Sequence, residues 1–361
     1  MRFDNLSSME NNAVLLKKHN LVKSMIMAAM LAAPLSGISA DGVESTDAVT
    51  AQVTPQMQER AASLSRILNF KAEYRRGVFM YDRTLSVYEK NPEKLAARCK
   101  ILGLTDIYYS FSDKHAADKK YSGRAAVFTA LFHKYGLKVH ALKYDGAEAF
   151  ASDSYVKKSA GTVLDYNQSV KPESRFDAVI ADLEPHILKK GRSFVPVNLE
   201  HYWNNDGYGP GKSNDRLVKQ ALSILALTKQ ELNGLEIAEA LGFFFESRYL
   251  KGELPSASIN NFLGPCAFVT LMAYANKPEK IFRMSESQLK NSPRPGSVAV
   301  CLKTSVGTLN DDGIESSLQP QGWDKLIEAA DYVTKEAGKY PAFRGIDFFE
   351  YAGLEKMWEN K

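Results

Sequence analysis

Short apolar runs alternate with segments of helical periodicity from residue 70 onward, and this alternation is what most constrains the fold. Such alternation is typical of βα units that build a parallel sheet. Strands are expected at 77–81, 106–111, 138–142, 176–183, the C-terminal end of 235–245, 268–274, 297–304 and 344–349. Helices are expected at 91–102, 124–135, 217–232, 323–337 and 354–358. Eight strands in this order predict an α/β fold of the (β/α)8 TIM barrel type. A doubly wound open sheet is the alternative, but no glycine-rich dinucleotide loop opens the chain.

The N-terminal segment has the pattern of an export signal. Lys17, Lys18 and Lys23 precede an apolar stretch at 24–35, and Ala40 is a small residue at the expected cleavage position. The apolar stretch is too short to span a bilayer, and no later segment is long and apolar enough to do so. We therefore expect a cleaved signal over 1–40, a weakly structured lead-in over 41–68, and a single barrel domain over 69–361. The expected location is the periplasm or outside the cell.

Charge and cysteine content exclude several classes of function. The chain has 46 basic and 42 acidic side chains, which leaves a formal net charge of +4. An excess this small provides no nucleic-acid-binding surface. Cys99, Cys266 and Cys301 cannot form a disulfide framework, and we expect them to be buried as small apolar residues. No phosphate-binding loop or serine nucleophile elbow is present, and no cofactor is expected.

Two carboxylates lie at the end of the fourth expected strand. Asp182 and Glu184 follow the apolar run at 178–181, and Pro185 ends the strand. Alternate residues of a strand share a face, so both carboxylates should point into the barrel mouth, where active sites of this fold lie. Adjacent carboxylates do not both ionise easily, and one can keep the proton that a general acid needs.

The same segment resembles the strand-four signature D-x-x-D-x-D-x-E of family 18 glycoside hydrolases, the chitinase-like barrels. Asp177, Asp182 and Glu184 match three of its four acids, and Ile180 replaces the fourth. Strand six adds a second likeness, because Met272-Ala273-Tyr274 is similar to the M-x-Y motif of that family. The next residue of the family motif, commonly acidic, is alanine at position 275, with Asn276 one position further on. In place of the family's strand-eight tryptophan, the nearby aromatic residues are Phe348, Phe349 and Tyr351.

The resemblance implies hydrolysis of a glycosidic bond in a carbohydrate substrate. Glu184 would protonate the leaving oxygen, and the acetamido oxygen of the substrate would attack the anomeric carbon. Asp182 would orient that acetamido group, and Tyr274 would donate a hydrogen bond to its carbonyl.

Other polar and aromatic residues at strand ends are candidates for substrate binding. They are Tyr81, Tyr144, Asp145, Trp203, Glu246, Asn276 and Glu350. Tyrosine and tryptophan stack on sugar faces, and Trp203 lies in a long segment, 187–215, expected to be a functional loop. Glu246 is the rival carboxylate: in a retaining enzyme with two carboxylates, Glu184 would be the acid/base and Glu246 the nucleophile.

Two further hypotheses remain open at this stage. A glycan-binding barrel that has lost catalysis is suggested by Ile180 and Ala275, which replace acids of the family pattern. A metal-dependent phosphodiesterase could use Asp182, Glu184 and His186 as ligands, although no partner histidine stands at ligand spacing.

Overall fold

The computed structural model describes residues 53–144, 146–197, 199–204, 212–306 and 316–359. Eight parallel strands form a closed barrel in chain order, which confirms the predicted (β/α)8 fold. Pairing of Val78 with Phe348 closes the barrel between the first and last strands. The strands are β1 Gly77–Met80, β2 Asp106–Ser110, β3 Lys138–Lys143, β4 Ala178–Ala181, β5 Glu236–Gly242, β6 Phe268–Met272, β7 Val298–Lys303 and β8 Phe343–Phe349.

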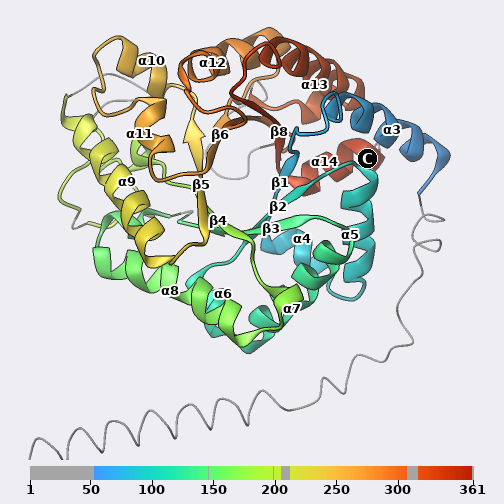
Figure 1. Ribbon diagram of the computed structural model, residues 1–361, viewed down its shortest axis with the longest axis horizontal. Coiled ribbons are helices and arrows are strands. Elements are labelled where there is room, and N and C mark those ends of the chain that lie inside the picture. The colour runs from blue at the N-terminus through green and yellow to red at the C-terminus, as the bar shows by residue number, and fades with distance from the viewer. Residues whose placement is uncertain (1–52, 145, 198, 205–211, 307–315, 360–361) are drawn as a thin grey trace, which may run out of the picture. The chain divides into compact units, whose positions relative to one another are not determined.

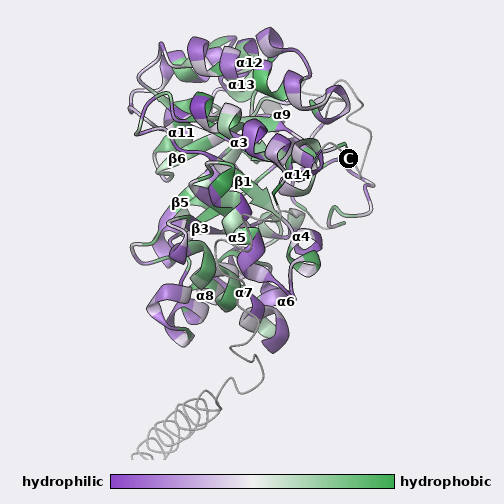
Figure 2. Ribbon diagram, turned by 90° about the vertical axis from the view of Figure 1, so that its right-hand side faces the viewer, coloured by the Kyte–Doolittle hydropathy of each residue, from purple (hydrophilic) through white to green (hydrophobic). Residues whose placement is uncertain are grey.

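Helices surround the strands on the outside of the barrel (Figure 1). They are α3 Pro55–Leu68, α4 Asp82–Val87, α5 Pro92–Ile101, α6 Asp113–Ala117, α7 Lys119–Lys134, α8 Asp153–Ser169, α9 Lys212–Glu231, α10 Phe245–Leu250, α11 Ile259–Leu263, α12 Pro278–Asn291, α13 Trp323–Ala337 and α14 Tyr351–Glu359. Figure 2 shows hydrophobic residues concentrated on the strands and hydrophilic residues on outer helices such as α6 and α12. No described helix is long and apolar enough to cross a membrane.

Two buried clusters divide the apolar residues of the barrel. The inner cluster fills the barrel and includes Phe79, Tyr108, Ile180, Ala238 and Cys301. The outer cluster lies between the strands and the helices. The three cysteines are buried and unbridged, as predicted.

A buried carboxylate organises the N-terminal end of the barrel interior. Asp106, the first residue of β2, accepts hydrogen bonds from Nε of Arg75 at 2.8 Å and Nε2 of His140 at 2.9 Å. Although burial alone opposes ionisation, these two partners hold the pKa of Asp106 well below its ordinary value. Residues at this end of a TIM barrel contribute to stability, so we assign Asp106 a structural role.

Several segments differ from the sequence-based expectation, among them helix α12, which was not predicted. Residues 55–68, assigned to a weakly structured lead-in, form helix α3, which begins with Thr54 capping the Met57 amide at 3.2 Å. Helix α8 was not predicted, because its buried side chains are interspersed with polar residues and Gly161, which obscure the apolar periodicity. Strand β5 occupies the N-terminal part of 235–245 and not its C-terminal end, since the chain turns into α10 after Gly242.

Candidate active site

The end of β4 carries the two predicted carboxylates toward the barrel mouth. Ile180 lies in the inner cluster, whereas its neighbours Val179 and Ala181 lie in the outer cluster. By the same alternation Asp182 continues the inner face. Its amide donates to the Lys143 carbonyl at 3.0 Å, which extends the β3–β4 pairing by one residue. Asp182 and Glu184 are both half-buried and so keep access to solvent.

Tyr274, at the end of β6, lies within the electrostatic reach of both carboxylates. Burial raises the pKa of Tyr274 well above its ordinary value, and Cys301, Asp182, Tyr81 and Glu184 reinforce that rise. The phenol is therefore protonated at neutral pH and can donate a hydrogen bond. Its hydroxyl lies against the Cys301 thiol, a weak hydrogen-bonding partner. Asp182, Glu184 and Tyr81 thus lie close enough to Tyr274 to influence it electrostatically.

An aromatic cluster lies next to these groups, centred on Phe349 at the end of β8. The ring centroid of Phe349 is 5.5 Å from that of Tyr274 and 5.9 Å from that of Tyr81. All three side chains are half-buried, so part of each ring remains accessible. Of the three aromatic residues considered for strand eight, Phe348 and Tyr351 are fully buried in the outer cluster. Phe349 is therefore the one that can form a floor for a flat ligand.

His186, two residues further along the chain, contacts the second carboxylate. Its Nε2 lies 3.6 Å from Oε1 of Glu184. The imidazole packs at its other edges against Phe244, at 5.1 Å between ring centroids, and against Trp203, at 6.4 Å. Glu184 is thereby held beside a histidine that is itself fixed by aromatic packing.

Glu239, on β5, supports the strand end from outside the barrel. Its flanking residues Ala238 and Ala240 face inward, so the Glu239 side chain faces outward, where it is fully buried. The Leu183 amide, between the two carboxylates, donates to Oε1 of Glu239 at 3.1 Å. Burial raises the pKa of Glu239 well above its ordinary value, with Asp182 the next largest contributor. Burial therefore favours the neutral form of Glu239, and the Leu183 bond fixes the backbone between the two acids.

Sequence reasoning missed Glu239, although one signal was present. The residue stands in the middle of the apolar run at 235–245, where an unpaired acid is unusual. Placing the strand at the C-terminal end of that run left position 239 outside the expected strand. The partner, Leu183, lies far away in sequence, and only the β4–β5 pairing brings the two together.

The raised pKa of Glu239 leads to a prediction about stability and pH. Protonated Glu239 contributes fully to the free energy of unfolding at a pH below the ordinary glutamate pKa. This contribution decreases as the pH rises toward the raised pKa of the folded state. The free energy of unfolding of the wild type should therefore fall relative to that of Glu239→Gln, by about 1 kcal/mol or more between pH 5 and pH 8. Urea unfolding at both pH values measures the difference. A difference between the two proteins that does not change with pH would contradict a neutral Glu239.

Tyr144 and Trp203 are buried and not exposed on the barrel mouth. The Tyr144 hydroxyl is 3.0 Å from Oγ1 of Thr228 on α9, so this tyrosine fills the layer between barrel and helices. Trp203 is 3% exposed and packs against His186 and Phe244. Both residues support the walls of the site, and neither offers an open ring for stacking. Asp145 lies outside the described residues.

The two remaining carboxylate candidates are also held in structural contacts. Glu246 lies on α10, is 2% exposed, and accepts the Ile259 amide of α11 at 2.6 Å. Burial raises its pKa. Glu350 is 1% exposed and forms an ion pair with Arg83. We therefore assign both carboxylates a structural role, distinct from that of Asp182 and Glu184. Asn276, two residues after Tyr274, is half-buried.

Asp177, the first acid of the strand-four signature, lies at the opposite end of β4. Its Oδ2 accepts the Val139 amide at 2.7 Å and contacts Nε2 of His133 at 2.8 Å. It therefore anchors the start of the strand. Within the described part of the chain, no three or more His, Cys, Asp and Glu side chains are grouped so that they could hold a metal ion.

Comparison with known proteins finds similarity in fold. No family model and no curated protein sequence matches the chain. Among solved structures, a GH18 chitinase from Pseudoalteromonas aurantia is 12% identical, with a TM-score of 0.50 over 79% of this chain and 97% of that protein. A β-glycosidase, BGL167, is 10% identical, with a TM-score of 0.52 over 78% of this chain and 87% of that protein. The chain thus shares the barrel architecture of these glycoside hydrolases at a distant level of sequence similarity.

Proposed function

We propose that the protein hydrolyses glycosidic bonds, with Glu184 as the general acid and Asp182 as its partner. The observation that carries this proposal is the convergence of Asp182, Glu184 and Tyr274 at the C-terminal ends of β4 and β6. Catalytic groups of TIM barrels come from the C-terminal ends of different strands. The GH18 chitinase and the β-glycosidase with the same architecture support a substrate of the glycoside class.

Glu184 lies where a carboxyl group could donate a proton to a leaving oxygen. It is only partly exposed, and the neighbouring acid at the same strand end is Asp182. Negative charge nearby opposes ionisation of a carboxyl group, and a protonated carboxyl at the site can donate to a leaving oxygen.

The nucleophile in this proposal comes from the substrate. A retaining mechanism with two carboxylates would need Glu246, which is buried and accepts the Ile259 amide instead. The resemblance to family 18 supplies the other route, in which the acetamido oxygen of an N-acetylated sugar attacks the anomeric carbon. Asp182 would stabilise the charge that develops on the acetamido group. The Tyr274 hydroxyl would leave the weakly bonding Cys301 thiol and donate to the acetamido carbonyl.

The sugar ring would rest on the half-buried rings of Phe349, Tyr81 and Tyr274. Aromatic faces provide flat apolar area that suits the C–H face of a pyranose. We also propose that the protein acts outside the cytoplasm, because residues 17–40 have the pattern of a secretory signal. The intact mass of protein recovered from the periplasm or culture medium tests whether cleavage follows Ala40.

The proposed function is tested by incubating the full chain with N-acetylated oligosaccharides and with their deacetylated counterparts. We expect new reducing ends from the acetylated series alone, at a rate that a chelator leaves unchanged. Equal cleavage of both series would contradict the substrate-assisted route. Calorimetric binding without any new reducing ends would favour a glycan-binding barrel, the alternative suggested by the apolar residues Ile180 and Ala275.

A further inference from the structure

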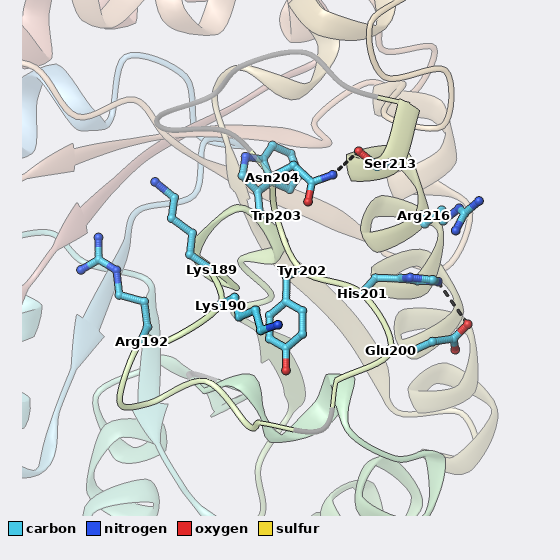
Figure 3. A pocket seen from close by; sticks show the side chains of 10 residues that line it. All are labelled: Lys189, Lys190, Arg192, Glu200, His201, Tyr202, Trp203, Asn204, Ser213 and Arg216. Atoms are coloured by element: carbon cyan, nitrogen blue, oxygen red, sulfur yellow. Dashed lines mark hydrogen bonds and ion pairs between the residues drawn. The ribbon is translucent and has the colours of Figure 1, made fainter.

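A separate cavity opens beside the strand-four end, between the loop that follows β4 and the start of α9. It has a volume of about 680 Å3. Lys190 and Arg192 line it from the loop, and Arg216 lines it from α9 (Figure 3). Tyr202 and Trp203 also contribute to its wall.

The cavity carries positive charge that no described acid neutralises. Lys190, Arg192 and Arg216 are exposed, and none of them forms an ion pair with a described carboxylate. Among the described residues that line the cavity the one acid is Glu200, whose Oε1 lies 3.2 Å from Nε2 of His201. Three cations that line one cavity and have no acidic partner among the described residues produce a field that attracts anions.

Hydrogen bonds hold together the loop and the helix that carry these cations. The Trp203 amide donates to the Leu188 carbonyl at 2.9 Å, which ties the two ends of the loop together. The Tyr202 hydroxyl donates to the Pro196 carbonyl at 3.0 Å. The Asn204 amide donates to the side chain of Asn214, on α9, at 2.9 Å. The loop and the helix therefore form one connected wall.

The same wall is continuous with the proposed general acid. The Trp203 ring packs against His186 with 6.4 Å between centroids, and His186 lies 3.6 Å from Glu184. A chain of sugars bound across Glu184 would need to pass over this wall to reach Lys190, Arg192 and Arg216.

We infer that this cavity is a subsite for an oxyanion carried by the glycan, so that the preferred substrate is an acidic glycan. The inference rests on the proposed function for the reaction, but its binding part stands on the cavity itself. Arginine presents paired N–H donors that match a carboxylate or sulfate, and lysine adds a mobile positive charge. A neutral glycan would gain no charge attraction from these three cations.

The experiment compares neutral, carboxylated and sulfated N-acetylated oligosaccharides of equal length. Values of kcat/KM are measured at low and high salt for the wild type and for the variant Lys190→Gln/Arg192→Gln/Arg216→Gln. The control, Lys251→Gln/Arg66→Gln/Arg175→Gln, removes the same charges from exposed positions elsewhere. Calorimetry on the Glu184→Gln protein measures binding of the same oligosaccharides independently of turnover.

We expect the wild type to prefer an acidic oligosaccharide over the neutral one at least tenfold, and the preference to weaken with salt. The triple variant should lose this preference, whereas the control should keep it. The carboxylated and sulfated arms identify which oxyanion the subsite takes. Equal kcat/KM for neutral and acidic oligosaccharides would overturn the inference.

Failure of the proposed function gives a different result. If no oligosaccharide is cleaved, tighter calorimetric binding of an acidic than of the neutral oligosaccharide, lost when the three cavity cations are also replaced, still supports the subsite. Equal binding of neutral and acidic oligosaccharides, or binding that the three replacements leave unaltered, overturns it.

Discussion

Replacing Glu184 by glutamine is expected to lower the rate of glycan hydrolysis about a thousandfold, because an amide cannot deliver a proton to the leaving oxygen. Glutamine has nearly the same volume as glutamate, and the half-buried side chain can remain beside His186. The fold should therefore survive. The measurement is the initial rate of reducing-end release at equal protein concentration, together with a thermal unfolding curve for each protein.

The matched control is Glu328→Gln on helix α13. Glu328 is more than half exposed, and in the described part of the chain its ion-pair partner is Lys325 on the same helix, at 2.8 Å. This variant changes net charge by the same amount and should keep the wild-type rate. A Glu184→Gln protein that unfolds normally and retains wild-type turnover would rule out Glu184 as the general acid.

Replacing Asp347 by alanine is expected to reduce the free energy of unfolding by about 3 to 5 kcal/mol, since it leaves buried donors without an acceptor. Asp347 lies inside the barrel on β8 and is fully buried. Its two oxygens accept the Gly77 amide at 2.7 Å and the Tyr108 hydroxyl at 2.8 Å. It therefore links β8 to β1 and β2 across the seam that closes the barrel.

Gly77 makes this contact sterically feasible. A Cβ atom at position 77 would lie 2.6 Å from Oδ1 of Asp347 and 2.5 Å from the Tyr108 hydroxyl. Only glycine leaves room for the carboxyl group to approach the backbone so closely. The close fit indicates that the loss on Asp347→Ala cannot be recovered by a small shift of neighbouring side chains.

The comparison variant for this prediction is Asp347→Asn. Its side-chain oxygen can still accept the Gly77 amide, and Tyr108 can turn its hydroxyl to accept from the amide nitrogen. Burial raises the pKa of Asp347, so a neutral side chain is already favoured there. We expect a loss of about 1 kcal/mol for Asp347→Asn by urea unfolding at pH 7. Equal losses for both variants would show that side-chain hydrogen bonding at 347 contributes nothing to stability.

The barrel could be predicted from the sequence because its strands are buried on both faces. Such strands appear as continuous apolar runs, and each run predicted here overlaps an observed strand. Helix α8 could not be recognised in the same way. Its buried positions, such as Val156, Ala160 and Val163, alternate with polar residues that face solvent, and tertiary packing supplies most of its stability.

The inward direction of Asp182 could be predicted because the strand alternation extends to it, through the bond of its amide to the Lys143 carbonyl. Tyr144 shows that a position at a strand end does not by itself place a side chain in the barrel mouth. It follows β3, yet it faces the helices and reaches Thr228. The direction of a side chain after the last paired residue depends on loop conformation and on neighbouring helices, which local sequence does not determine. Glu239 required knowledge of which strand lies next to β4.

The central claim, that Glu184 donates a proton to the leaving group, is tested most directly by a series of aryl N-acetylglycosides whose phenols differ in acidity. A strongly acidic phenol departs without help, whereas a weakly acidic one needs protonation. The measurement is the ratio of wild-type to Glu184→Gln rates across the series. We predict a ratio that is large for weakly acidic phenols and falls toward one as the phenol becomes more acidic. A ratio that stays constant across the series would contradict the account.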